Sequence, residues 1–209
     1  MSVADPMTRA HASCSAPGQD IDPGAAEFKR HVKARLASRV RHTENDPTLI
    51  CAAVLVPLLC KDGEWHILVT QRTEQVEQHK GQISFPGGAC DVGDAGLEAT
   101  ALREAFEEIG VPPESVEILG QLDDFPTVTH FVVAPFVGVI PHPFGYRLNR
   151  REVEATVEVP ISFFRDPAHL RVEQREHEGC LHDVLFWDYG SYVIWGATAR
   201  ILKTFLDLI

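Results

Sequence analysis

The sequence predicts an α/β protein in which helices cover both faces of a mixed β-sheet. Two apolar runs, Cys51–Cys60 and Phe131–Ile140, have the length and composition of buried strands. Leu97–Ile109 instead carries its apolar residues at helical spacing. Because the predicted strands and helices do not alternate strictly, a mixed sheet sandwiched by helices fits better than a parallel one.

The N-terminal part is predicted to contain a tail and a helix. Residues 1–25 are rich in Ala, Ser, Pro, Gly and Asp without periodicity, and we expect a disordered tail there. An apolar residue then recurs at every fourth position, which predicts one helix with a narrow stripe: Phe28, Val32, Leu36 and Val40. This segment is strongly basic, which indicates a solvated face or a docking face for phosphates or another subunit. Residues 26–209 are expected to form one domain.

The other elements follow in chain order. Lys61-Asp62-Gly63 predicts a hairpin turn between Cys51–Cys60 and a second strand, His66–Gln71. Gln82–Phe85 is a short strand that Pro86-Gly87-Gly88 breaks into a loop, and Gly110 ends the helix that follows. The remaining predicted elements are strands at Val116–Leu122, Val157–Val159, Leu170–Gln174 and Asp183–Trp187, a polar loop at Pro141–Arg151, a helical turn at Ile161–Arg165 and a last helix from about Gly196.

Composition excludes several classes of protein. The chain has 209 residues and a net charge of −11, which argues against binding to nucleic acid or to an anionic membrane. No apolar run reaches the ~20 residues that a membrane helix needs. The five cysteines are widely spaced and odd in number, so we expect reduced thiols and a cytoplasmic location.

The most informative stretch is the acidic helix that follows the glycine pair Gly87-Gly88. At 100° per residue, Glu104 and Glu108 lie within about 40° of each other, and Glu107 lies about 60° to their side. The apolar residues of the helix occupy the opposite arc. Like charges at this spacing repel, so three carboxylates on one face need a cation or full solvation. Mg²⁺ or Mn²⁺ is the expected cation, since both prefer oxygen ligands and share their coordination shell with substrate phosphates.

This stretch resembles the Nudix box, GX5EX7REUXEEXGU, in which U is an apolar residue. The matching residues are Gly88, Arg103, Glu104, Glu107, Glu108, Gly110 and Val111. Asp94 stands where the box has a Glu, and eight residues rather than seven separate it from Arg103. The resemblance implies a Nudix-type α/β/α sandwich and a diphosphate hydrolase.

The shifted spacing is shared by the coenzyme A diphosphatase subgroup of Nudix hydrolases. That subgroup carries a pattern close to LLTxR(S/A)xxxRxxxGxxxFPGG, and Leu68–Gly88 reads LVTQRTEQVEQHKGQISFPGG. Val69, Thr73 and Glu77 depart from it, and Glu77 places an acid where the subgroup has a base. The C-terminal stretch Trp195–Leu202, WGATARIL, also resembles the subgroup.

The resemblance implies a role for each residue of the box. Glu104 and Glu108 would be the principal metal ligands, and Glu107 would share the metal or accept a proton from the attacking water. Arg103 would orient carboxylates through charge-assisted hydrogen bonds. Glu152 is the acid that a later loop would add as a base or ligand, with Glu154 as the other candidate.

The same resemblance implies a set of substrate contacts. Coenzyme A carries a 3′-phosphate besides its diphosphate, so an acidic protein must supply local cations. The residues expected to bind substrate are Arg72, His79, Gly87, Gly88 and Arg147.

The expected activity is metal-dependent hydrolysis of coenzyme A or acyl-CoA to 3′,5′-ADP and (acyl-)4′-phosphopantetheine. One alternative is the same chemistry on another nucleoside diphosphate derivative, such as ADP-ribose or a dinucleotide. A second is a Nudix-fold binding module without turnover. A homodimer also stays an open alternative, because homodimers are common in this fold.

Overall fold

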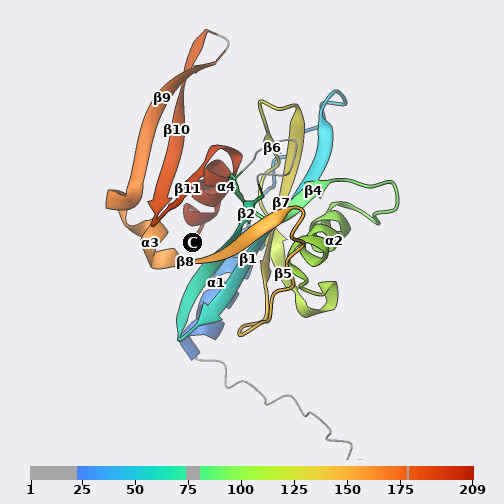
Figure 1. Cartoon of the computed structure of the whole chain (residues 1–209), viewed down its shortest axis with the longest axis vertical. Helices are drawn as coiled ribbons and strands as arrows, with labels where there is room; N and C mark the ends of the chain where they lie inside the picture. Colours follow the sequence, from blue (N-terminus) through green and yellow to red (C-terminus); the bar gives the residue numbers. More distant parts are fainter. Residues whose placement is uncertain (1–22, 74–80, 178) are drawn as a thin grey trace, which may run out of the picture.

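Strand β1 (Ile50–Lys61) runs through the middle of an eight-stranded mixed sheet in the computed structural model, which describes residues 23–73, 81–177 and 179–209 (Figure 1). Its side chains alternate between two buried clusters. Leu55 and Leu59 face one side, and Val56 and Leu58 face the other. A strand that is apolar on both faces belongs in the interior of a sheet, where both faces are covered.

The other strands of this sheet surround β1. Its neighbour β7 (Phe131–Val139) is parallel to it, and the remaining strand pairs are antiparallel. Asp62 and Gly63 both have positive φ, as a two-residue hairpin turn requires. The other strands are β2 (Glu64–Arg72), β3 (Ile83–Ser84), β4 (Gly87–Ala89), β5 (Glu117–Gln121), β6 (Phe125–Pro126) and β8 (Val153–Pro160).

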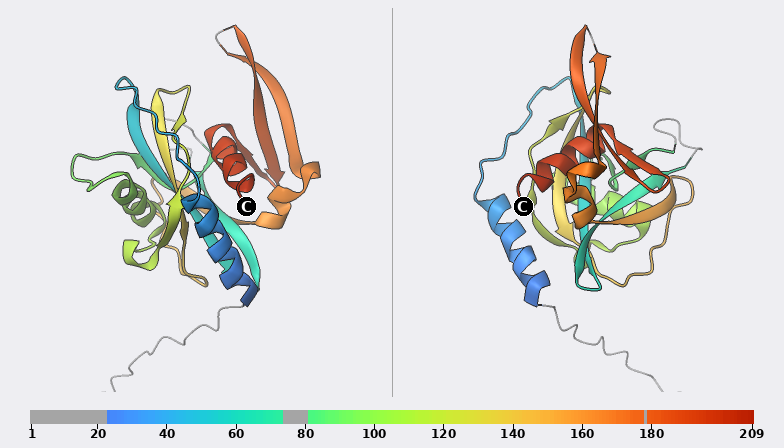
Figure 2. Two further views of the ribbon diagram at one scale, coloured as in Figure 1. Left: turned by 180° about the vertical axis from the view of Figure 1, so that it is seen from behind. Right: turned by 90° about the vertical axis from the view of Figure 1, so that its left-hand side faces the viewer.

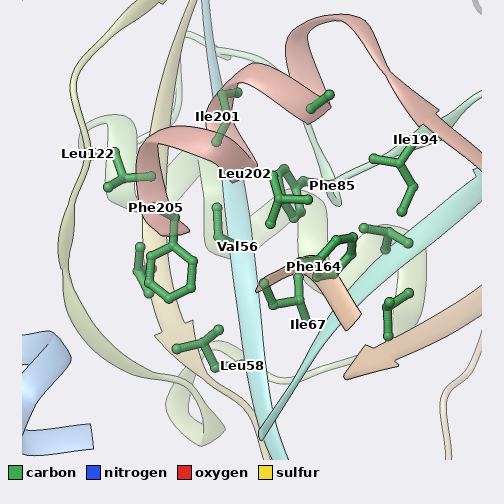
Figure 3. Close-up of a cluster of buried hydrophobic side chains, with 14 of the residues drawn as sticks. Val56, Leu58, Ile67, Phe85, Leu122, Phe164, Ile194, Ile201, Leu202 and Phe205 are labelled. Atoms are coloured by element: carbon green, nitrogen blue, oxygen red, sulfur yellow. The ribbon is translucent and has the colours of Figure 1, made fainter. Parts of the chain in front are cut away.

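Helices cover both faces of the sheet, as the α/β prediction requires. On one face, α2 (Leu97–Ile109) packs its buried alanines against β1 and β7. On the other face lie α1 (Pro23–Ala37), α3 (Ile161–Arg165) and α4 (Gly196–Leu206), as Figures 1 and 2 show. Figure 3 shows the apolar cluster on this second face, where Leu202 and Phe205 of α4 meet Val56 and Leu58.

A second, three-stranded antiparallel sheet extends away from this body (Figure 1). It consists of β9 (Leu170–His177), β10 (Cys180–Tyr189) and β11 (Tyr192–Trp195). Its base is anchored by Trp187 and Ile194, which are buried in the cluster that contains α4. The sequence pattern predicts parts of β9 and β10 but misses β11 and the separation into two sheets.

Short 3₁₀ turns lie at Pro113–Ser115 and Pro167–His169.

Helix α1 differs from the prediction at both ends. It begins at Pro23, so the last three residues of the predicted tail are helical, with proline at a position that helices favour. It ends at Ala37, and Val40 is 97% exposed rather than part of the apolar stripe. The Ser38 hydroxyl donates to the Arg35 carbonyl oxygen, a local bond that competes with continuation of the helix.

The glycine segment also differs from the prediction. Gly87-Gly88 belongs to strand β4, which pairs with β1 through Ala53↔Gly88 and Val54↔Gly87. The expected loop is therefore a short strand. A Cβ on Gly87 would lie 2.5 Å from the Ala53 carbonyl oxygen, so the absence of a side chain allows the two strands to approach.

The expectation that all cysteines are reduced thiols is corrected at one pair. Cys51 and Cys90 form a disulfide between β1 and the residue after β4, with their Cα atoms 5.5 Å apart. These residues are 39 positions apart in the chain, so their contact depends on the pairing of β4 with β1 and leaves no local signal. Across the described ranges, no helix is long and apolar enough to cross a membrane.

Candidate active site

Helix α2 carries its predicted carboxylates beside its buried face rather than opposite to it, since Glu104 lies against Gly88 of β4 and Glu108 is 2% exposed. Ala101, Ala105 and Ile109 are fully buried against the sheet, whereas the apolar Phe106 is 45% exposed, so the predicted separation of apolar and acidic residues on opposite arcs is wrong. Gly110 ends the helix in a left-handed conformation, φ 76°, and its N–H donates to the Phe106 carbonyl oxygen. The predicted helix bounds are confirmed at both ends.

Arg103 lies at the centre of the acidic face and is held from several sides. Its Nε and Nη2 donate to the two carboxylate oxygens of Asp94 at 2.9 and 3.0 Å. Its Nη1 donates to Glu104 Oε1 at 2.8 Å and lies 3.4 Å from Glu107 Oε2. These contacts occupy the guanidinium group and hold it between Asp94, Glu104 and Glu107.

Asp94 is the partner that fixes Arg103 in place. It also accepts hydrogen bonds from the Thr100 hydroxyl, at 2.8 Å, and from the Asp91 backbone N–H. These donors, Arg103 first among them, hold the pKa of Asp94 far below its usual range. The sequence shows Asp94 only as a departure from the box, and the fold reveals it as the bidentate partner of Arg103.

Glu108 is the most buried carboxylate of the site, with 2% of its side chain exposed. Burial raises its pKa to about 8, and the negative charges of Glu104 and Glu152 act in the same direction. Arg72 of β2 opposes this effect, because its Nη1 lies 3.8 Å from Glu108 Oε1. A neutral carboxylic acid in this position would become a carboxylate again if a cation were bound.

Glu152 joins the site from the segment that leads into β8. Burial is the main cause that raises the pKa of Glu104. The negative charges of Glu107 and Glu152 act in the same direction. Glu152 is half-buried, whereas Glu154 two residues later is exposed. The charge of Glu152 thus acts on both Glu104 and Glu108.

The glycine pair Gly87-Gly88 lies next to two of the carboxylates. Gly88 lies beside the Glu104 carboxyl group, and Gly87 lies near enough for its backbone N–H to stabilise the charged form of Glu108. For two predicted substrate contacts, Arg147 and His79, the structure shows no such proximity to the carboxylates. Arg147 is exposed and meets α2 through its backbone N–H, which donates to the Ile109 carbonyl oxygen at 3.0 Å. His79 lies outside the described residues.

The fold and the acidic helix together define a class of protein. The NUDIX domain model matches residues 50–177, which is more than half of the chain. The chain therefore belongs to the Nudix family. It is a Nudix hydrolase, and the class acts on nucleoside diphosphate derivatives.

Relatives and solved structures agree with this assignment. An uncharacterized Nudix hydrolase NudL from Enterobacter sp. (strain 638) is 42% identical over 155 residues, 73% of this chain and 79% of the relative. The NudL protein of Citrobacter koseri is 41% identical over 152 residues, with the same coverage. The crystal structure of a MutT/nudix family protein from Enterococcus faecalis covers 87% of this chain and 73% of its own, with a TM-score of 0.50 and 14% identity, which shows the fold.

Nudix hydrolases generally use divalent metal ions, and the residues of α2 fit such an ion. Glu108 Oε2 is buried and makes no hydrogen bond to any described residue. A buried, unsatisfied carboxylate oxygen is costly unless a cation or donor meets it. Within the described ranges, no three His, Cys, Asp or Glu side chains already stand in metal-binding geometry. Arg103 contacts one carboxylate oxygen of Glu104 and one of Glu107, at 2.8 and 3.4 Å.

Proposed function

We propose that this chain hydrolyses the diphosphate bond of coenzyme A or acyl-CoA, giving 3′,5′-ADP and (acyl-)4′-phosphopantetheine. One observation supports this substrate above others. The two stretches that resemble the subgroup, Leu68–Gly88 and Trp195–Leu202, lie far apart in the chain but touch in the fold. The Thr198 hydroxyl donates to the Ile83 carbonyl oxygen at 3.2 Å, in a buried position.

This contact links the C-terminal motif to the acidic helix. Ile83 pairs with Gln71 of β2, next to Arg72, and Arg72 approaches Glu108. The segment from Ile83 then leads directly to Gly87 and Gly88 of β4. Both stretches of the subgroup pattern are thus connected to the carboxylates that would act on the diphosphate.

The proposed reaction is the attack of water on one phosphorus of the diphosphate. A P–O bond forms to the water oxygen, the bridging P–O bond breaks, and the leaving phosphate carries the electron pair. Glu104, Glu107 and Glu108 would hold Mg²⁺ or Mn²⁺. The bound ion would neutralise phosphate oxygens and acidify the attacking water.

The chain's own residues have separate tasks in this reaction. Arg103 keeps Glu104 in position while Asp94 holds Arg103. Glu152 accepts the proton of the attacking water or completes the metal shell, and Glu107, with a half-exposed side chain, is the second candidate for the proton. Arg72 neutralises charge where Glu108 and the substrate phosphates meet.

Cations are also needed for the 3′-phosphate of coenzyme A. Arg147 is exposed and lies beyond the C-terminal end of α2, so it can move toward a bound nucleotide. We propose it, together with His79 and Arg72, as a substrate contact. Glu77, an acid where the subgroup has a base, keeps ADP-ribose or a dinucleotide as the alternative substrate.

Product analysis by chromatography tests the proposal. Purified protein is incubated with coenzyme A, acetyl-CoA, ADP-ribose, NADH and diadenosine polyphosphates, each with Mg²⁺ and with Mn²⁺. We expect 3′,5′-ADP from coenzyme A with a kcat/KM well above those of the other substrates, and no product from Glu107→Gln above background. Inert coenzyme A with cleavage of ADP-ribose or a dinucleotide would refute the substrate and retain the diphosphate chemistry.

A further inference from the structure

The chain makes a tight turn just before β8, and this turn connects the catalytic helix to Glu152. The Asn149 backbone N–H donates to the Glu108 carbonyl oxygen at 2.9 Å. The Asn149 carbonyl oxygen accepts from the backbone N–H groups of Glu152 and Val153, at 2.9 and 2.8 Å. One residue thus joins the last turn of α2 to the residue that brings the added acid.

The side chain of Asn149 continues this connection. Its Nδ2 donates to Glu152 Oε1 at 3.0 Å, and its Oδ1 accepts from the Arg151 backbone N–H at 3.2 Å. The backbone N–H can only donate, so it fixes which end of the amide is oxygen and which is nitrogen. The amide nitrogen therefore faces the Glu152 carboxylate, and a carboxylate can only accept.

The residue that follows β2 holds the backbone of the same turn. Thr73, buried directly after β2, donates from its N–H to the Glu152 carbonyl oxygen and from its hydroxyl to the Arg151 carbonyl oxygen, both at 2.9 Å. These bonds place the main chain at Glu152, and the bond from Asn149 selects the orientation of its carboxylate.

We infer that Asn149 is a positioning residue, which holds the Glu152 carboxylate toward Glu104 and Glu108. This inference rests on the proposed function, in which Glu152 is a base or a metal ligand. Removing a residue that orients such a group typically lowers activity about 10–100-fold. They act on the reacting geometry rather than on substrate binding, so the loss falls on kcat.

A double-mutant cycle tests the inference on the full chain, with the substrate that product analysis shows to be cleaved best. Asn149→Ala should lower kcat roughly 10–100-fold with KM within about twofold. Glu152→Gln should lower kcat at least as much. In the double variant, Asn149→Ala should cause no further loss, because its effect passes through Glu152.

Asn149→Asp separates positioning from turn formation. Aspartate keeps the oxygen that accepts from the Arg151 N–H, so it preserves the turn. It removes the donor to Glu152 and adds a like charge there. We expect kcat at or below that of Asn149→Ala, with a melting temperature near that of the parent chain. Full activity of Asn149→Asp would mean that Asn149 serves the turn alone and would overturn the inference.

The remaining outcomes separate the proposed role of Glu152 from the inferred role of Asn149. If Glu152→Gln lowers kcat while Asn149→Ala does not, or if the two losses add in the double variant, the role of Glu152 stands and the inference about Asn149 falls. If Glu152→Gln retains full activity, the proposed role of Glu152 falls, and the inference falls with it. Glu114→Gln is the control, since Glu114 is an exposed acid in the short turn Pro113–Ser115 and should leave kcat unchanged.

Discussion

Gly88 of β4 lies directly against Glu104 of α2. A Cβ at residue 88 would stand 2.6 Å from both Cδ and Oε1 of the Glu104 carboxyl group. The pairing of β4 with β1 fixes the backbone at Gly88, so a side chain there would have to displace the carboxylate. The glycine is thus required by the position of the Glu104 carboxyl group rather than by the strand itself.

Gly88→Ala is therefore expected to damage activity far more than stability. The displaced atoms are the flexible end of a glutamate side chain, so the free energy of unfolding should change by less than about 1 kcal/mol. A carboxylate displaced by about 1 Å can lower kcat about 100-fold. Steady-state kinetics and thermal melting of the same preparation check both expectations.

Gly93→Ala is the matched control. Gly93 lies in the exposed loop before α2, with open space where its Cβ would be. It should retain kcat. Equal activity of Gly88→Ala and the parent chain would show that Glu104 does not need the position seen here.

The local patterns of the sequence predict the elements of this fold well. Helix α2 is found from its apolar spacing and from Gly110, and the β1–β2 hairpin from Asp62-Gly63, since these signals lie within a few residues of each other. The carboxylates on one helix face follow from the same geometry. The α/β class and the position of α3 are also confirmed.

Contacts between distant segments account for what the sequence does not reveal. Residues Gly87–Ala89 form strand β4 because β1 supplies their hydrogen-bonding partner. The sequence Gly-Gly alone predicts a loop. The backbone at Glu152 is held by Thr73, which lies directly after β2, and no spacing rule connects these two residues. Such partners are determined only when the strands have been placed.

Asp94→Asn should lower activity by releasing Arg103. The variant replaces one of the two oxygens that Arg103 binds with an amide nitrogen that cannot accept. We expect kcat to fall about 10–100-fold, as is typical when a partner that orients a ligand is lost. Kinetics at saturating metal ion measure the loss. Asp91→Asn is the control, because Asp91 is exposed and its carboxylate lies 3.8 Å from Arg103.

The same variant should also lose stability in a pH-dependent manner. The pKa of Asp94 is lowered in the folded state, so its contribution is present above the unfolded-state pKa and is lost as the pH falls through the folded-state value. The difference in melting temperature between Asp94→Asn and the parent should therefore be largest near neutral pH and shrink in strong acid. A constant difference from pH 7 to pH 2 would contradict this account.

Metal affinity should rise with pH up to about pH 8. Glu108 has a pKa of about 8 and must lose its proton to bind a cation. Below that pH, affinity should fall by about tenfold per pH unit for the one proton released. Titration calorimetry with Mn²⁺ between pH 6 and 8.5 measures the affinity. Repeating it in two buffers of different ionisation enthalpy gives the number of protons released. Affinity that does not change over this range would show that Glu108 is ionised before the metal binds.

Glu108→Gln should abolish activity and stabilise the metal-free protein. Burial raises the pKa of Glu108 from 4.5 to about 8 on folding, so the folded chain binds more protons than the unfolded chain between these values. The stability of the parent therefore declines as the pH rises from about 4.5 to about 8. Glutamine is neutral throughout and should remove this decline, with a gain of more than about 1 kcal/mol at pH 8 and little at pH 5.

The charge left on Arg72 does not reverse this expectation. A quarter of its side chain is exposed, so water can solvate the guanidinium group once Glu108 is neutral. Glu98→Gln is the control, since Glu98 is an exposed acid in the first turn of the same helix. Denaturant unfolding at pH 5 and pH 8, in the presence of a chelator, compares the three chains. If Glu108→Gln were less stable than the parent at pH 8, Glu108 would be an ionised, well-paired group rather than a carboxylate held ready for a cation.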